Sequence, residues 1–232
     1  IQNKCSCIFV TTDKVYENNE TGLLYSEDDK LGGYDPYSSS KAAVELAVKS
    51  WRSSFCGENK YQTPFLSVAT ARSGNVIGGG DWSDYRIVPD CIKALKEGEK
   101  ILIRNPSSTR PWQHVLEPLN GYLKLAEKIF NTYELSNNAI KNIHEEAYNF
   151  GPDIDSNKSV IELVNEIFKI WPGRYYVQSD KIVPYEARLL SLSSEKAKRN
   201  LNWENKWSFQ ETIHKTINWY RKFHSGTDAL QC

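Results

Sequence analysis

The sequence predicts an α/β fold, namely the C-terminal part of a doubly wound parallel sheet followed by a smaller, mostly helical cap. Two observations support this prediction. Near the N-terminus, short apolar segments alternate with a long helical pattern, which is the order of a strand–helix–strand unit. In the last third of the chain, helical patterns dominate. We place the sheet-forming part at residues 1–150, with interleaved segments at about 75–120, and the cap at residues 151–232.

Composition limits the classes of partner. Hydrophobic residues make up 40% of the 232 residues, which is enough for a packed core. The 29 Lys and Arg residues balance 29 Asp and Glu residues, so we expect neither nucleic acid nor a membrane as a partner. The five cysteines lack the spacing of a disulfide framework or a zinc site. We therefore expect reduced thiols in the cytoplasm and no metal.

The first elements follow one another in the order strand, helix, strand. Residues 7–10 form a short apolar run that is typical of a strand buried in a parallel sheet. The polar and glycine-containing residues 17–36 predict a long loop. Residues 37–55 carry apolar side chains at helical spacing directly after a proline, and residues 65–71 form a second buried strand. The apolar positions of the helix are Val44, Leu46, Ala47, Val48, Trp51 and Phe55.

The remaining elements are mostly helical. Their patterns predict helices at 88–96 and 116–130 and a short strand at 147–150. Ser159 and Glu162 have the spacing of a capping box, in which a serine and a glutamate three residues later satisfy the free amides at a helix start. Ser208 and Glu211 repeat that spacing. Each pair therefore predicts the start of a helix.

The first candidate site combines a helix start with a strand end. Tyr37 and Lys41 are four residues apart, so they lie on one helix face, where the ammonium would favour the phenolate and make Tyr37 a usable base. This spacing alone is common on solvated helices. Thr12 lies 25 positions before Tyr37, at the carboxyl end of a strand, where open α/β sheets bind ligands. Asp13 and Lys14 follow as acid and base candidates, although a charged solvated turn would have the same sequence.

Longer motifs resemble a known family. Residues 11–16 (TTDKVY), 32–41 (GGYDPYSSSK), 71–82 (ARSGNVIGGGDW) and 110–119 (RPWQHVLEPL) are similar to the extended short-chain dehydrogenase/reductases, and within them to the nucleotide-sugar 4,6-dehydratases. The likeness runs over nearly the whole chain. Related dTDP-sugar enzymes carry Asp-Glu where this chain has Asp13-Lys14, a pair that resembles the CDP-sugar branch.

The resemblance implies a fold, a cofactor and residue roles. It implies a Rossmann-like domain that binds NAD, interleaved substrate segments, and a substrate-binding cap. Tyr37 would take the proton of the sugar C4 hydroxyl, and Thr12 would hydrogen-bond the sugar. The cofactor would be contacted by Tyr37, Lys41 and Ser73. Asp13 would protonate the departing C6 hydroxyl. Lys14 would take the C5 proton, which requires a neutral amine and hence burial or a nearby cation.

The same resemblance implies a nucleotide-sugar site. Planar guanidinium groups suit paired phosphate oxygens, and Arg110 is the best candidate by motif. The full set of implied substrate contacts is Asn75, Arg86, Arg104, Arg110, Trp112, His114, Tyr148 and Glu186. For the aromatic residues among them, a place in the core is an equally good interpretation, and for Glu186 a place on the surface.

One expected motif is absent. The dinucleotide fingerprint G-x-G-x-x-G does not occur, the chain begins at Ile1, and it contains no methionine. We therefore expect a piece of a longer protein that is inactive by itself, the full-length protein being a homodimer or homotetramer. Two alternatives stay open: an epimerase of the same superfamily, and a non-catalytic fragment that binds sugar nucleotides. The nucleobase follows from resemblance alone.

Overall fold

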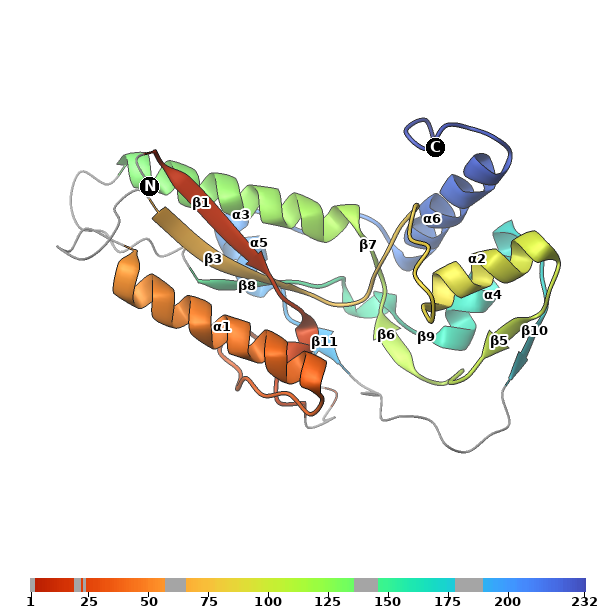
Figure 1. Ribbon diagram of the computed structural model, residues 1–232, viewed down its shortest axis with the longest axis horizontal. Helices are drawn as coiled ribbons and strands as arrows, with labels where there is room; N and C mark the ends of the chain where they lie inside the picture. Colours follow the sequence, from red (N-terminus) through yellow and green to blue (C-terminus); the bar gives the residue numbers. More distant parts are fainter. Residues whose placement is uncertain (1–2, 19–21, 23, 57–65, 136–145, 178–189) are drawn as a thin grey trace. The chain divides into compact units, whose positions relative to one another are not determined.

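A computed structural model describes residues 3–18, 22, 24–56, 66–135, 146–177 and 190–232. The chain divides into two compact units, and each unit is assembled from three separate segments. The first unit comprises Ile1–Gly74, Glu117–Gly151 and Leu190–Asn205. The second comprises Asn75–Leu116, Pro152–Leu189 and Lys206–Cys232. The predicted class is confirmed, because the described chain is mixed α/β with parallel strands (Figure 1).

The first unit is built on a three-stranded parallel sheet. Its strands are β1 (Cys5–Val10), β3 (Leu66–Ser73) and β8 (Ala147–Phe150), in the order β1-β3-β8. Figure 1 shows α1 (Pro36–Phe55) and α3 (Leu116–Leu135) on opposite sides of this sheet. Alternate residues of β3 serve the two sides: Ala69 and Ala71 pack in one core with α3 residues, whereas Val68 packs with α1.

Shorter elements complete the first unit. A 3-10 turn, η1 (Asp13–Val15), follows β1 directly. The predicted loop at 17–36 contains a two-residue strand, β2 (Leu24–Tyr25), which pairs in parallel with β11 (Ser191–Leu192). The helix α5 (Glu195–Leu201) packs against β8. Residues 190–205 thus belong to the same unit as the N-terminal strands, although they lie far from those strands in the sequence.

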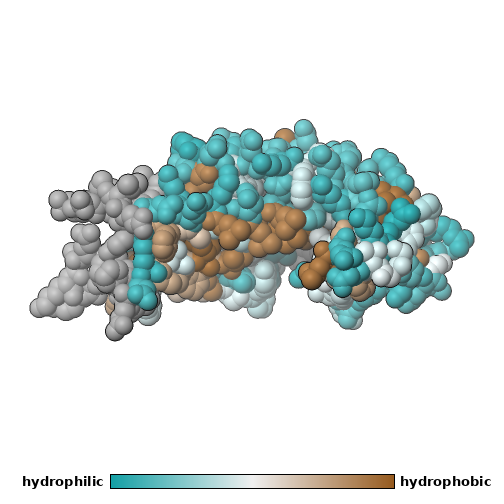
Figure 2. Space-filling view, turned by 90° about the horizontal axis from the view of Figure 1, so that it is seen from above, coloured by the Kyte–Doolittle hydropathy of each residue, from teal (hydrophilic) through white to brown (hydrophobic). Residues whose placement is uncertain are grey.

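The helix α1 starts as predicted, but its packed face is not the apolar one. Its buried residues are Ser38, Ala42, Glu45 and Val48. Most of the predicted apolar positions are exposed instead, namely Val44, Leu46, Trp51 and Phe55. Phe9 and Val10 of β1 and Leu119, Leu123 and Phe130 of α3 are exposed as well. Figure 2 shows hydrophobic surface, in brown, gathered in a band rather than scattered.

The second unit joins three helices to short strand pairs. Its helices are α2 (Ile87–Glu97), α4 (Val160–Ile170) and α6 (Phe209–His224). The parallel pairs are β5 (Ile101–Ile103) with β10 (Tyr175–Val177), and β4 (Val76–Ile77) with β7 (Gln113–His114). The antiparallel pair is β6 (Thr109–Pro111) with β9 (Asn157–Ser159), which the 3-10 turn η2 (Ile154–Ser156) precedes.

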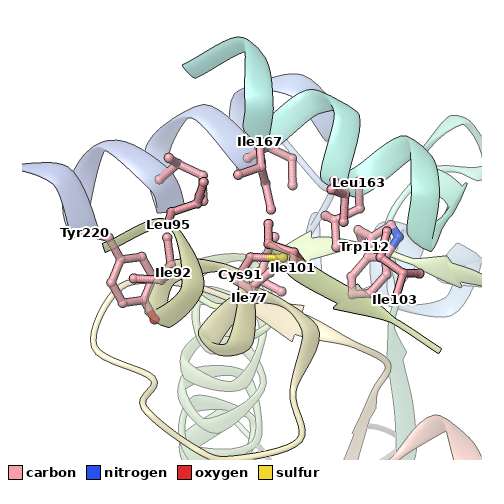
Figure 3. Packing of buried hydrophobic residues seen from close by; sticks show 14 of the residues in the cluster. Ile77, Cys91, Ile92, Leu95, Ile101, Ile103, Trp112, Leu163, Ile167 and Tyr220 are labelled. Carbon is pink, nitrogen blue, oxygen red and sulfur yellow. The ribbon is translucent and has the colours of Figure 1, made fainter. Parts of the chain in front are cut away.

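The core of this unit lies between α2, α4, α6 and β5. Figure 3 shows Leu163 and Ile167 of α4 pointing toward Ile101 and Ile103 of β5. Tyr220 closes the cluster from α6, and its hydroxyl donates to the Gly78 and Asp81 carbonyls, at 3.2 and 2.7 Å. Both predicted capping boxes are present, at the starts of α4 and α6.

A glycine run makes the closest backbone approach in the second unit. Gly79 lies against the indole of Trp219 on α6, and a Cβ added to Gly79 would be 2.1 Å from Trp219 Cδ2. Gly80 follows with φ of +82°, a conformation that favours glycine. The run therefore provides close packing against α6.

The described residues contain neither a membrane-spanning helix nor a metal-binding cluster. Among them, no helix is both long and apolar enough to cross a membrane. In the same part of the chain, no three side chains of the metal-binding types gather in a group that could hold an ion.

Candidate active site

The strand end at β1 forms a fixed turn. Thr12 is the N-cap of η1: its Oγ1 accepts a hydrogen bond from the Lys14 amide at 3.4 Å and donates one to Asp13 Oδ1 at 3.0 Å. Thr12 and Asp13 are both buried, whereas Lys14 is exposed. The three residues predicted to act on the sugar hydroxyl, the leaving group and the C5 proton thus occupy one short turn.

The start of α1 faces this turn. Asp35 caps the helix by accepting hydrogen bonds from the Ser38 hydroxyl at 2.5 Å and the Ser38 amide at 3.0 Å, and these bonds lower the pKa of Asp35. Tyr37 lies in the first helical turn and is 51% exposed, and Lys41 is half-buried one turn later. The Lys14 Nζ lies 6.0 Å from the centre of the Tyr37 ring, and α1 packs on η1.

A buried ion pair lies below the turn, and sequence reasoning missed it. Glu45 of α1 and Arg72 of β3 are each 3% exposed and form two parallel hydrogen bonds of 2.9 Å. Thr11 and Thr70 donate to the same carboxylate, at 2.5 and 2.6 Å. Burial acts to raise the pKa of Glu45, but Arg72 and the hydrogen bonds from Thr11 and Thr70 together hold this pKa below its ordinary value. Glu45 is therefore ionised and fully hydrogen-bonded.

The guanidinium of Arg72 extends the network to two further residues. Its Nη1 donates to the Tyr16 hydroxyl at 2.8 Å, and Tyr16 donates onward to Asn149 Oδ1 at 2.7 Å. Burial raises the pKa of Tyr16 to about 12, so this phenol stays neutral and keeps the proton that it donates. One signal was visible in the sequence: an arginine near the end of a strand that is expected to be buried requires a buried partner.

Ser73, predicted to contact the cofactor, ends β3. Its Oγ lies 2.7 Å from the Tyr122 hydroxyl of α3, and burial raises the pKa of Tyr122. Ser73 is 8% exposed. The serine is therefore held at the carboxyl edge of the sheet by a neutral phenol.

The predicted phosphate-binding residues belong to the second unit. Arg86 is the N-cap of α2 and forms an ion pair with Asp81 at 3.0 Å. Arg104 is exposed and lies 5.3 Å from the centre of the Tyr85 ring. Arg110, on β6, is half-buried and donates to the Thr109 carbonyl at 2.7 Å. Asn75, directly before β4, is half-buried.

The predicted wall residues are mostly core residues. Trp112 is 3% exposed and its Nε1 donates to the Lys158 carbonyl at 2.8 Å. Tyr148, on β8, has no exposed surface, and its hydroxyl accepts from Asn200 Nδ2 at 3.2 Å. The alternative interpretation as core aromatics therefore describes both residues. Glu186 lies outside the described residues.

His114, the remaining wall residue, is buried on β7. Its ring meets the Trp207 ring edge to face, with centroids 4.8 Å apart, and its Nδ1 accepts from the Leu116 amide at 3.3 Å. Burial, helped by the nearby Lys215, lowers the pKa of His114 to about 4. His114 is therefore a neutral acceptor at physiological pH.

Comparison with known proteins identifies the family. A family described as GDP-mannose 4,6 dehydratase matches residues 1–216. The chain belongs to this family. It is 35% identical over its whole length to CDP-glucose 4,6-dehydratase of Salmonella typhimurium, of which it covers 63%. It is 26% identical over 96% of its length to dTDP-D-glucose 4,6-dehydratase of Mus musculus, of which it covers 58%.

Solved structures agree with this family at the level of the fold. The dTDP-glucose 4,6-dehydratase from Bacillus anthracis, in complex with NAD, has a TM-score of 0.68 and 21% identity, with 93% of this chain and 61% of that chain covered. The UDP-glucuronic acid 4-epimerase from Bacillus cereus, in complex with UDP-glucuronic acid and NAD, has a TM-score of 0.72 and 18% identity, with 94% and 62% covered. The chain thus spans less than two thirds of these relatives.

Proposed function

We propose that this chain is the catalytic and substrate-binding part of an NAD-dependent sugar-nucleotide 4,6-dehydratase that converts CDP-glucose to CDP-4-keto-6-deoxyglucose. One observation carries the proposal: the turn that bears Asp13 and Lys14 lies against the start of the helix that bears Tyr37, with the Lys14 ammonium 6.0 Å from the Tyr37 ring. An acid and an amine beside a phenol suit an elimination. The 35% identity to a CDP-glucose 4,6-dehydratase supports the choice of substrate.

The residues at the strand end fit the nicotinamide end of NAD. Tyr37 presents an exposed phenol, Lys41 presents an ammonium on the same helix face, and Ser73 stands at the edge of the same sheet. These donors suit ribose hydroxyls. When bound, NAD would accept a hydride from C4 of the sugar and return one to C6. The fingerprint for the NAD pyrophosphate is not in this chain, which covers 63% of the CDP-glucose 4,6-dehydratase, so the adenine half would bind to residues outside this chain.

The first proton transfer would occur at the C4 hydroxyl. Tyr37, as phenolate, would accept this proton while Thr12 hydrogen-bonds the sugar oxygen. Lys41 would favour the phenolate by its charge and hold the ribose. The C4 ketone that results makes the C5 hydrogen acidic, because that hydrogen then lies α to a carbonyl.

Elimination would use the other two residues of the turn. Asp13 would protonate the C6 hydroxyl as it leaves as water, and Lys14 would take the C5 proton. Lys14 needs a neutral amine for this step, yet it is exposed and close enough to Asp35 for its charge to help lower the pKa of that carboxyl. The burial that favours the neutral amine would therefore come from the bound sugar nucleotide itself.

The substrate diphosphate would bind to residues of the second unit. Arg104 and Arg110 can each offer guanidinium donors, and Asn75 adds a neutral donor. Arg86 would have to leave Asp81 to serve in the same way. Of the wall residues, His114 and Glu186 stay candidates for direct contact, whereas Trp112 and Tyr148 would support the site by packing. The full-length protein would act in the cytoplasm as a homodimer or homotetramer.

The experiment compares this chain with the same chain extended by its natural preceding residues. Each is given CDP-glucose and NAD, and the product is detected by the ultraviolet absorbance that 4-keto-6-deoxy sugars develop in alkali. We expect product from the extended protein, and at least a hundredfold loss in Tyr37→Phe because the general base is removed. Binding of CDP-glucose without any product from the extended protein would support the non-catalytic alternative.

A second variant separates the dehydratase from the epimerase. Asp13→Asn keeps the shape of the side chain but removes the acid, so we expect loss of the keto product. An epimerase needs no acid for water loss. Release of the C4 epimer of CDP-glucose by the unmodified protein, undiminished in Asp13→Asn, would contradict the dehydratase proposal.

A further inference from the structure

We propose that the buried Glu45–Arg72 ion pair is a positioning device that holds the Thr12–Lys14 turn in register with Tyr37 and Lys41. This inference rests on the proposed function, because it assigns the pair to the alignment of the groups that would carry out dehydration. Both oxygens of Glu45 already accept hydrogen bonds from Arg72, Thr11 and Thr70, and Arg72 also binds Tyr16, so we assign the pair no direct contact with the substrate. Their effect must pass through the residues that they bind.

The ion pair holds the turn at its first end. Thr11 is the residue directly before Thr12, and its hydroxyl donates to Glu45 Oε1 at 2.5 Å. The Thr11 amide donates to the Ala71 carbonyl of β3 at 2.8 Å, directly before Arg72. The last residue before the turn is therefore fixed both to the neighbouring strand and to the carboxylate of the helix.

The ion pair also holds the turn at its other end. Tyr16 is the residue directly after η1, and its hydroxyl accepts from Arg72 Nη1 at 2.8 Å and donates to Asn149 at 2.7 Å. The Tyr16 ring stacks on Tyr25 with centroids 5.1 Å apart. Because Glu45 binds Thr11 and Arg72 binds Tyr16, one ion pair holds the chain on both sides of the catalytic turn.

The third connection is the helix itself. Glu45 follows Lys41 by four residues and Tyr37 by eight, so all three lie along one side of α1. A shift of Glu45 along or around the helix axis would move Tyr37 and Lys41 by a similar amount relative to Thr12 and Asp13. The carboxylate thus sets the helix register against the strand end.

Stability alone does not explain a charged pair at this place. Replacing a buried ion pair with apolar residues of similar volume is often neutral or stabilising. Alignment is different, because a misplacement of about 1 Å between reacting groups can cost a factor of about 100 in rate. The two-pronged geometry of Arg72 on Glu45 restricts direction as well as distance, which packing of aliphatic side chains would not do.

The test uses two threonines that donate to the same carboxylate. Thr11→Val removes the hydrogen bond that holds the turn, and Thr70→Val removes the 2.6 Å hydrogen bond from the middle of β3, which does not hold the turn. In the full-length protein we expect Thr11→Val to lower kcat about tenfold or more with KM for CDP-glucose within twofold of the unmodified value. We expect Thr70→Val to keep kcat within about twofold at a comparable loss of thermal stability.

Glu45→Gln gives a second readout. If the turn alone loses its alignment, elimination should slow more than oxidation at C4. Reduced nicotinamide should then accumulate during turnover in Glu45→Gln and in Thr11→Val. It should not accumulate in Thr70→Val. A uniform loss of all steps in proportion to unfolding would indicate a merely structural role. Equal kcat in Thr11→Val and Thr70→Val would overturn the proposal.

A third readout does not depend on the reaction. Hydrogen exchange of a peptide that spans residues 11–16 should accelerate in Thr11→Val relative to Thr70→Val, because the turn opens locally. If the full-length protein forms no product from CDP-glucose, the proposed function fails, yet the exchange experiment still decides whether the ion pair fixes the turn. Equal exchange in the two variants would overturn the positioning inference.

Discussion

His114 is the described histidine whose environment most strongly opposes its charged form. It is 8% exposed, it packs on Trp207, and its pKa is about 4 against an ordinary value of 6.5. The unfolded chain binds a proton more readily than the folded chain between these two values. His114 therefore has no effect on the pH dependence above about pH 7, and it lowers stability as pH falls from 6.5 toward 4.

This sign gives a prediction. Between pH 7 and pH 4.5, His114→Gln should lose less unfolding free energy than the unmodified protein, by on the order of 2 kcal/mol. Urea unfolding at each pH, followed by tryptophan fluorescence, measures the difference. The matched control is His214→Gln, because His214 is exposed on α6. If acid lowered the unfolding free energy of His114→Gln as much as that of the unmodified protein, the assignment of His114 as a buried neutral group would be contradicted.

At the scale of single residues, the sequence predicted the candidate residues of the turn and the helix start, but not the buried ion pair that lies beneath them. Thr12, Asp13, Tyr37 and Lys41 form recognisable spacings, and the structure brings the turn and the helix start together. Whether these residues are catalytic stays a prediction. Glu45 could not be found, because a glutamate on a helix gives no sign of which face is covered, and its donors come from β3 and from the residue that follows β1, both far away in sequence.

Helix starts are the elements whose origin is most local. Asp35 caps α1 and Ser208 caps α6, and each side chain satisfies an amide that the helix itself leaves free. Such signals lie within four residues, so the starts of α1, α4 and α6 could be predicted from sequence.

The two caps differ in their distance along the chain from the candidate site, which gives a second prediction. Asp35→Ala and Ser208→Ala should each cost about 1 kcal/mol of stability. Only Asp35→Ala should also lower kcat, since Tyr37 lies two residues after the cap and would fray with the first turn. Thermal unfolding and turnover of CDP-glucose, measured on both variants, check this. Equal kcat in the two variants would mean that the start of α1 does not position Tyr37.

Other elements depend on distant partners and could not be predicted. The strands β2 and β11 have two residues each, and they exist because Leu24 pairs with Ser191 across most of the chain. The packing of α1 is a similar case. The predicted helix is present, but its apolar side chains and its buried side chains lie on different sides. The strands that cover α1 pack on the side that carries Glu45.

The whole chain divides into two units, and each is assembled from three separate segments. Residues 75–116 belong to the second unit. Residues 190–205, which contain β11 and α5, belong to the first unit again. Long-range pairing, such as that of β11 with β2, decides that residues 190–205 belong to the first unit. The assignment of NAD binding to one part and substrate binding to the other stays a prediction.

Exposed apolar side chains give a prediction for the chain as a whole. Leu46, Trp51 and Leu123 are each more than half exposed, and β1, an outer strand of the sheet formed by the described residues, carries the exposed Phe9 and Val10. Such surfaces favour association. We expect this chain by itself to bind an apolar dye and to elute as soluble aggregates in gel filtration, whereas the N-terminally extended protein should bind less dye. A monodisperse monomer without dye binding would contradict this prediction.

The contact between Gly79 and Trp219 links two distant positions in any change of sequence. The indole occupies the space that any side chain at position 79 would need. A relative that carries alanine or serine at the position of Gly79 must therefore carry a smaller residue at that of Trp219, or must move the end of its last helix. A side chain at position 79 therefore requires a compensating change in the last helix.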